Sequence, residues 1–136
     1  ADANTTGSQN TAVGLGALGG NTTASNNTAI GYYALTANTT GAYNTAVGLN
    51  SLAAATTGSA HTAIGAGALL TNTTGQKNTA VGVNALEANT TGSENVAVAK
   101  DALQSNTTGS SNAAFGMDAL KSNTTASITQ LLVGGL

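Results

Sequence analysis

The stretch NTAVGVNALEANTTGSE, residues 78–94, contains the pattern that decides the fold of this chain. The same 17-residue pattern occurs seven times in residues 10–128, without an insertion or a deletion. Its consensus is Asn-Thr-Ala-Val/Ile-Gly, two variable residues, Ala-Leu, two variable residues, Asn-Thr-Thr-Gly and two further variable residues. A uniform period lets each unit contact its neighbours in one fixed register, and this is the sequence signature of a solenoid.

The local chemistry of one unit predicts the path of a coil. Asn-Thr-Ala-Val-Gly favours a short strand, with Thr and Val on one face and Ala on the other, and Asn-Thr-Thr-Gly favours a turn. The Ala-Leu segment fits either a second short strand or a single helical turn. We therefore expect an all-β fold, with or without that helical turn: a parallel β-solenoid, or β-roll, of 17-residue coils. It forms one domain, residues 1–136, made of a half-coil (1–9), seven repeats (10–128) and a half-coil (129–136).

Two repeat positions carry a large apolar residue in every unit, and we expect them to form the core. A neighbouring Ala column leaves room for a methyl group only. At about 25 cal/mol per Å² the core of one coil is modest, so stability must come from stacking many coils. The predicted core ladders are Val13, Leu18, Ile30, Leu35, Val47, Leu52, Ile64, Leu69, Val81, Leu86, Val98, Leu103, Phe115 and Leu120.

An asparagine column in the turns predicts a ladder of side-chain amides, with simple turn chemistry as the alternative reading. Both readings can hold together. His61 takes the place of the asparagine that opens the other units, and we interpret it as a ladder substitution. The residues of the turn column are Asn21, Asn38, Asn72, Asn89, Asn106 and Asn123.

Composition excludes several classes of partner. Charged residues make up 6% of the chain and the net charge is −2, so there is no basic patch for nucleic acid. No stretch approaches the length that spans a membrane. All charges occupy variable repeat positions, which we expect to face water, and none lies between Ala3 and Gln76. Tyr32, Tyr33 and Tyr43 lie in this uncharged part and are either a lateral contact between chains or ordinary surface residues.

No motif predicts an enzyme, a cofactor or a metal site. The stretch GLGALG, residues 14–19, matches the dinucleotide fingerprint, but no long strand precedes it, no helix follows and no acidic residue lies about 20 positions on. A lone imidazole, His61, without Cys makes a poor metal or catalytic site. Thr pairs such as Thr39–Thr40 recur along the chain and raise ice binding as a further interpretation. This interpretation is less favoured, because adjacent residues of a strand point to opposite faces and would not form one flat array.

Asn-x-Thr sequons recur in the turn column, where a glycan on every coil would crowd its neighbours. This favours a prokaryotic or phage source. Because the chain begins at Ala1 without Met, we expect a processed, secreted form, located outside the cell or on its surface.

The Asn-Thr-Ala-Val-Gly unit resembles the head repeats of trimeric autotransporter adhesins, the YadA-like β-rolls, and the NTAVG/NTTG repeats of tail-fibre-like surface proteins. The resemblance covers residues 10–128 and is most specific in NTAVG and NTAIG. It implies an extracellular, adhesive and often trimeric protein with a parallel β-roll. Heptad stalk, membrane-anchor strands and C-terminal chaperone domain are not found in this sequence.

The two half-coils suggest how copies could associate. Aligned by period, residues 129–136 occupy the first eight positions of a unit and residues 1–9 the last nine. The leading hypothesis is a secreted structural subunit that stacks head to tail on copies of itself into an extracellular filament. The alternative is an adhesin-head or tail-fibre module that forms a lateral homotrimer, with a surface receptor undefined. The predicted junction residues are Ala1, Asn4, Thr5, Thr6, Gly7, Leu131, Leu132, Val133 and Leu136.

Overall fold

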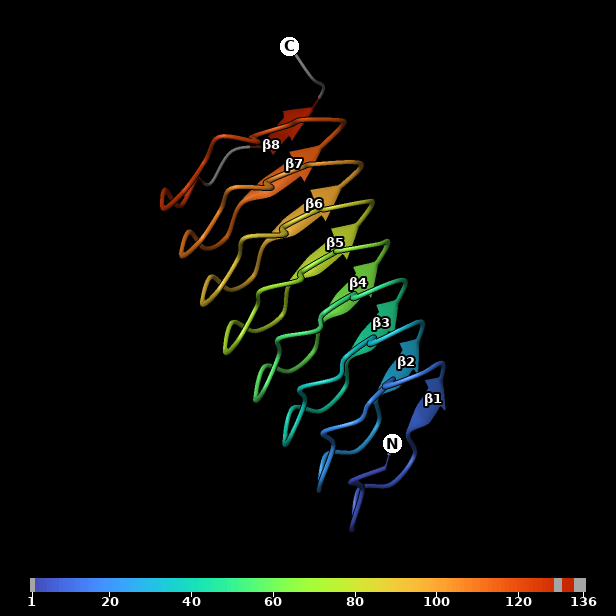
Figure 1. Cartoon of the computed structure of the whole chain (residues 1–136). Coiled ribbons are helices and arrows are strands. Elements are labelled where there is room, and N and C mark those ends of the chain that lie inside the picture. The colour runs from blue at the N-terminus through green and yellow to red at the C-terminus, as the bar shows by residue number, and fades with distance from the viewer. Residues whose placement is uncertain (1, 129–130, 134–136) are drawn as a thin grey trace.

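The chain folds into a parallel β-solenoid, shown in Figure 1 as a rod of stacked coils. The structure is a computed structural model that describes residues 2–128 and 131–133, and this part contains strands and turns but no helix. The Ala-Leu segment is therefore a run of turns. The described strands form one parallel sheet in chain order: β1 Thr11–Val13, β2 Thr28–Ile30, β3 Thr45–Val47, β4 Thr62–Ile64, β5 Thr79–Val81, β6 Val96–Val98, β7 Ala113–Phe115 and β8 Leu131–Val133.

The coils from β1 to β7 stack in strict register. Ala46 pairs with Ala63, 17 positions later, and every other strand pair up to β7 follows the same spacing. Each strand stops at a corner where the backbone of the next coil comes close. At Gly31, φ is +139°, and a Cβ there would lie 2.4 Å from the carbonyl oxygen of Gly48. Glycine at this corner allows both the positive φ and the close stacking of coils.

The leucine column forms the centre of the core, as predicted. Leu18, Leu35, Leu52, Leu69, Leu86 and Leu103 are fully buried, and Leu120 packs against this cluster. The whole column has φ between 51° and 54°, a left-handed conformation that costs a non-glycine residue about 1–2 kcal/mol. Burying a leucine side chain is worth about 1.5–3 kcal/mol. Burial of the side chain therefore holds the backbone in a conformation that leucine rarely adopts.

The second predicted core column faces outward, and the prediction that it forms the core is wrong. It comprises Val13, Ile30, Val47, Ile64, Val81, Val98 and Phe115. Val13 is 56% exposed, and Ile30 and Ile64 are each 40% exposed. The alanine between Thr and Val/Ile points inward instead and is fully buried from β2 to β7. The leucine fills the centre of the coil and leaves space beside it only for the methyl group of alanine. Because side chains alternate along a strand, the Thr before this alanine and the Val or Ile after it point outward.

The 17-residue register ends before the last strand. β8 pairs Leu131 with Ala113 and Leu132 with Ala114, a spacing of 18. The sequence alignment had placed Leu131 in the column of Ala114, so that alignment is one residue out of register. The backbone N–H of Ile128 donates to Asn112 Oδ1 at a spacing of 16 residues. Internal coils make the equivalent bond at a spacing of 17, as from the Asn44 N–H to Asn27 Oδ1. The spacing of 17 therefore holds up to Ser127, which accepts a bond from the Ser110 N–H, and is lost at Ile128.

The inward and outward columns predict opposite responses to truncation within one coil. We expect Leu69→Ala to lower the free energy of unfolding by about 2–5 kcal/mol, because it removes buried side-chain volume. Ile64→Ala, which shortens a side chain that is 40% exposed, is expected to cost less than about 1 kcal/mol. Urea denaturation of the dilute protein measures both, and equal losses would contradict the assignment of the two columns.

Candidate interaction surface

An apolar stripe runs along the outside of the rod. Its first column is the outward Val/Ile position of the strands, and its second lies two residues further along each coil. In the second column Leu15 is 70% exposed, Leu49 52% and Met117 58%. Lys100 is the only charged residue in either column. The apolar stripe comprises Val13, Leu15, Ile30, Tyr32, Val47, Leu49, Ile64, Ala66, Val81, Val83, Val98, Phe115 and Met117.

The regular backbone of the coils sets the form of this stripe. Coils that stack at a spacing of 17 residues repeat each outward side chain at about 4.8 Å, so each column forms a ridge along the rod. β-branched side chains have few χ1 rotamers, so the ridges lose little entropy on contact with a partner. A continuous exposed apolar surface is typical of a binding face. Seven of these thirteen residues were predicted to lie in the core, so the repeat pattern did not reveal the stripe.

The three tyrosines do not form one contact surface. Tyr32 and Tyr33 follow β2 and pack edge to face, with ring centroids 4.4 Å apart. Tyr32 belongs to the apolar stripe, while the ring of Tyr33 lies over Gly16, where a Cβ would be 2.6 Å from Tyr33 Cδ1. Tyr43 precedes β3 and is 67% exposed. Tyr32 therefore extends the candidate surface, and Tyr33, which is 39% exposed, packs against it.

The turn asparagines form the predicted amide ladder. Asn89 Nδ2 donates to Asn72 Oδ1 at 2.8 Å in the preceding coil and to the Gly92 carbonyl at 2.9 Å in its own turn. Asn106 repeats this pattern towards Asn89. The ladder and the turn readings thus both hold. Because Nδ2 of these buried residues is engaged, the ladder itself blocks a glycan in the folded chain, in addition to the crowding expected between coils.

A second asparagine ladder opens each coil. Asn44 N–H donates to Asn27 Oδ1 at 2.9 Å, and Asn44 Nδ2 donates to the Gly58 carbonyl at 2.9 Å. His61 stands in this ladder, as predicted: its backbone N–H donates to Asn44 Oδ1 at 3.0 Å. Sequence analysis did not predict the rest of this ladder, although an asparagine or histidine at the first position of every repeat was the available signal.

The paired threonines of the turns have different roles. Thr39 Oγ1 donates to the Thr56 carbonyl at 3.0 Å in the next coil, and its side chain is half-buried. Thr40 is exposed. One hydroxyl of each pair is thus used between coils, and the two side chains do not make a joint flat array.

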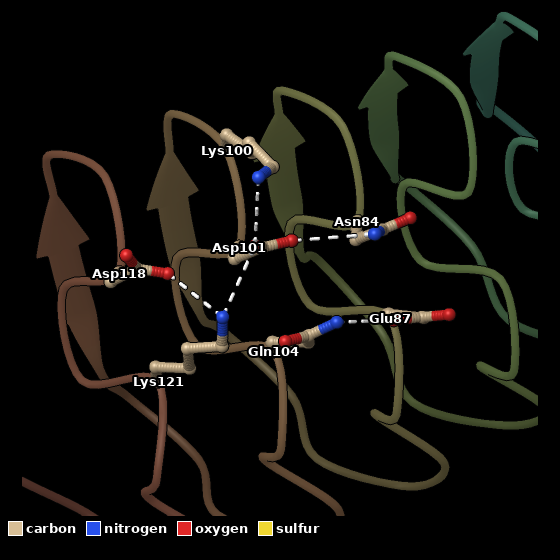
Figure 2. Close-up of polar contacts among 7 residues, drawn as sticks. All are labelled: Asn84, Glu87, Lys100, Asp101, Gln104, Asp118 and Lys121. Carbon is tan, nitrogen blue, oxygen red and sulfur yellow. Dashed lines mark hydrogen bonds and ion pairs between the residues drawn. The ribbon is translucent and has the colours of Figure 1, made fainter.

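A charged cluster lies at the C-terminal part of the rod (Figure 2). Lys121 Nζ lies 3.2 Å from Asp101 Oδ2 and 2.9 Å from Asp118 Oδ1, and Asn84 Nδ2 donates to Asp101 Oδ1 at 3.3 Å. The Asp101 side chain is only 8% exposed. The expectation that all charges face water is therefore wrong at this position, because Asp101 finds its partners in the coils on either side.

Opposing effects act on the pKa of Asp101. Burial alone would raise it, but hydrogen bonds from Lys121 and Asn84, with the charges of Lys121 and Lys100, lower it below its usual value. The same contacts raise the pKa of Lys121, with the bond to Asp118 contributing most. Gln104 Nε2 donates to Glu87 Oε2 at 2.7 Å beside this cluster. The cluster is a set of satisfied contacts between coils.

The predicted junction residues that the structure describes lie at opposite ends of the sheet. Asn4 Oδ1 accepts a bond from Asn21 Nδ2 at 2.8 Å, and Thr5 N–H donates to the Thr22 carbonyl at 2.9 Å, so the first turn stacks as the alignment predicted. Thr6 and Gly7 belong to the same turn. Leu131, Leu132 and Val133 form β8, and Ala1 and Leu136 lie outside the described residues.

No pocket is detected, and no group of three or more His, Cys, Asp or Glu side chains is placed to hold a metal ion within residues 2–128 and 131–133. In those residues no helix has the length and hydropathy to cross a membrane. Comparison with protein-family models, with curated proteins and with solved structures gives no significant match for this chain.

The two aspartates of the charged cluster give a matched test. We expect Asp101→Ala to lower the free energy of unfolding by about 1–3 kcal/mol, because it removes a buried partner of Asn84 and Lys121. Asp118→Ala, at an exposed site, should cost less than about 1 kcal/mol.

The pH dependence of this difference has a defined sign. A carboxylate with a lowered pKa stabilises the fold above its usual value, 3.8, and loses that contribution as the pH falls. The difference in the free energy of unfolding between the wild type and Asp101→Ala should therefore become smaller as the pH falls. Urea denaturation at several pH values measures this difference. A gap that widens in acid would contradict the described pairing.

Proposed function

We propose that the protein is a structural, non-enzymatic rod that associates side by side with copies of itself outside the cell. The observation that carries this proposal is the apolar stripe, which presents an aliphatic ridge on nearly every coil. Water covers this ridge in the isolated chain, and a second rod with the same axial spacing can cover it along its whole length. Each coil then adds a similar contact, so the free energy of association grows with the number of coils in register.

The resemblance to adhesin head repeats supports the same proposal. That family forms lateral trimers of parallel β-rolls outside the cell, and a discrete trimer is the oligomer we propose. The low charge of the stripe supports contact between like chains, because only Lys100 adds charge to the two columns. A receptor for such a rod is left undefined.

We also propose head-to-tail stacking as a second mode of assembly, in which a further coil pairs with the edge of β1. Ala12 is exposed, whereas the equivalent Ala29, Ala46 and Ala63 are fully buried by the coil that precedes each of them. Within the described residues β1 pairs on one side only, with β2. An unpaired edge is a template for a further strand. Repeated addition would give a filament with an axial rise of about 38 Å for eight coils.

Charge placed on the stripe tests the lateral proposal. We expect the wild type to sediment as a discrete oligomer and Ile30→Glu/Ile64→Glu to sediment as a monomer, because two buried carboxylates in the contact are costly. Thr40→Glu/Thr74→Glu, on the exposed turn, is the matched control and should keep the wild-type oligomer. Sedimentation velocity over a wide range of concentrations measures all three, with circular dichroism to confirm that each is folded.

The same samples distinguish the two modes of assembly. A wild type that is monomeric at all concentrations would refute both, and an oligomer that survives Ile30→Glu/Ile64→Glu would refute the lateral mode. Filaments in electron micrographs that are lost on deletion of residues 129–136, but kept in the stripe variant, would establish head-to-tail stacking instead.

A further inference from the structure

The turn ladder is interrupted once in the described coils, at Ala55. This alanine stands where the neighbouring coils have Asn38 and Asn72. Asn38 Oδ1 would accept a bond from an asparagine at position 55, and it is the one buried side-chain nitrogen or oxygen without a hydrogen-bond partner in the described residues. The interruption thus leaves a carbonyl oxygen in the core without a donor.

His61 occupies the other side of the interruption. Its Nε2 lies 3.1 Å from Asn72 Nδ2, the atom that would otherwise donate to an asparagine at position 55. In regular coils the side-chain oxygen of the preceding turn asparagine occupies this place: Asn72 Oδ1 accepts the bond from Asn89 Nδ2. The imidazole therefore extends into the space that Ala55 leaves free. The two departures from the repeat, Ala55 and His61, are complementary in volume and in position.

The contacts of the ring require a neutral imidazole. Nδ1 accepts the backbone N–H of Asn78 at 3.2 Å, so it must present a lone pair. The ring proton is then on Nε2, which faces the carbonyl of Gly75. A protonated Nε2 cannot accept a hydrogen bond from Asn72 Nδ2, so the 3.1 Å approach of these two nitrogens is a packing contact. An imidazolium would direct an Nδ1–H at the N–H of Asn78 and lose this bond between coils. His61 is only 1% exposed, so water cannot replace the lost partner while the coils remain stacked.

Nothing charged faces the ring from the coils packed on it. Tyr43, in the coil before, is exposed, and no charged residue lies between Ala3 and Gln76. In the coil after, Lys77 and Glu94 pair with each other at 3.5 Å with both side chains more than half exposed, and Glu87 bonds to Gln104. No carboxylate is therefore placed to stabilise an imidazolium. Burial lowers the pKa of His61, and the bond to the Gly75 carbonyl offsets this effect only in part.

We propose that the Ala55–His61 pair is an acid-sensitive break in the rod, at which protonation of His61 separates the coil stack locally while the remaining coils stay folded. Solenoid coils contact only their neighbours, so an opening at His61 need not spread. The break lies between an uncharged segment and the segment that carries Lys77 and all later charges. This inference does not depend on the proposed self-association.

The direction of the pH effect follows from linkage. An opened coil exposes His61, which then binds a proton near its usual pKa of 6.5, whereas the closed coil binds it only at lower pH. The closed state is therefore fully stable above this value and loses stability as the pH falls below it. At about pH 5 the opening constant should rise by up to about 30-fold, if the closed form stays neutral.

Residue-resolved amide hydrogen exchange of the full chain tests the proposal. After correction for the intrinsic exchange rate, we expect opening at Asn78 to increase by up to about 30-fold between neutral pH and about pH 5. Opening at Leu103, two coils away, should change little. Ala55→Asn/His61→Asn restores both ladders to the repeat pattern, and we expect it to remove the increase at Asn78. His61→Asn alone is the variant that tests the imidazole without refilling position 55.

Two results would overturn the proposal. One is an increase on acidification that is the same at Asn78 and Leu103, and the other is an increase at Asn78 that persists in both variants. The ¹⁵N chemical shifts of the ring give an independent readout, because the structure requires the proton on Nε2 at neutral pH. A proton on Nδ1 would contradict the bond from Asn78.

Discussion

The in-register stacking of 17-residue coils is the constraint on which the rest of the structure depends. Backbone bonds between strands fix the axial spacing, and the two asparagine ladders fix the register. Asn44 donates to Asn27 Oδ1 and to the Gly58 carbonyl, and Asn89 donates to Asn72 Oδ1 and to the Gly92 carbonyl of its own turn. An asparagine amide can form this ladder only if the next coil presents the same atom at the same height. A constant repeat length is therefore a requirement of the hydrogen bonding. The core itself is narrow and holds leucine and alanine.

This constraint explains why the outer surface is apolar. The inside of each coil is filled by one leucine and small side chains, which leaves no room for the β-branched residues that short strands favour. Ile30 and Ile64 consequently lie on the outside, where the constant spacing aligns them into a ridge. A rod built in this way presents a large apolar surface as a direct result of its interior. The proposed association with further copies would bury that surface.

The sequence predicts the architecture well and the surface less well. Period, strand position, the leucine core and the turn ladder all follow from repeated residues, because each signal occurs in at least six of the seven units. The alternation of Thr, Ala and Val assigns faces to the strand but does not say which face is inside, and the larger residues were wrongly placed there. Asp101 sits in a variable column, and its partners Asn84 and Lys121 are contributed by other coils. The pairing of β8 could not be predicted from the repeat, because β8 pairs with β7 at a spacing of 18 residues and the repeat has a spacing of 17.

The chain contains no cysteine, so a pair of introduced thiols tests the central claim, that coils 17 residues apart stack with Ala inside and Val/Ile outside. The structure predicts that Val47→Cys/Ile64→Cys forms an intrachain disulfide readily, because paired strand residues about 4.8 Å apart lie within disulfide range and both side chains face outward. Val47→Cys/Ala63→Cys should not, because its second thiol points into the coil. Mass spectrometry of the oxidised, dilute proteins measures both. A disulfide in the second pair and none in the first would contradict the stacking and its register.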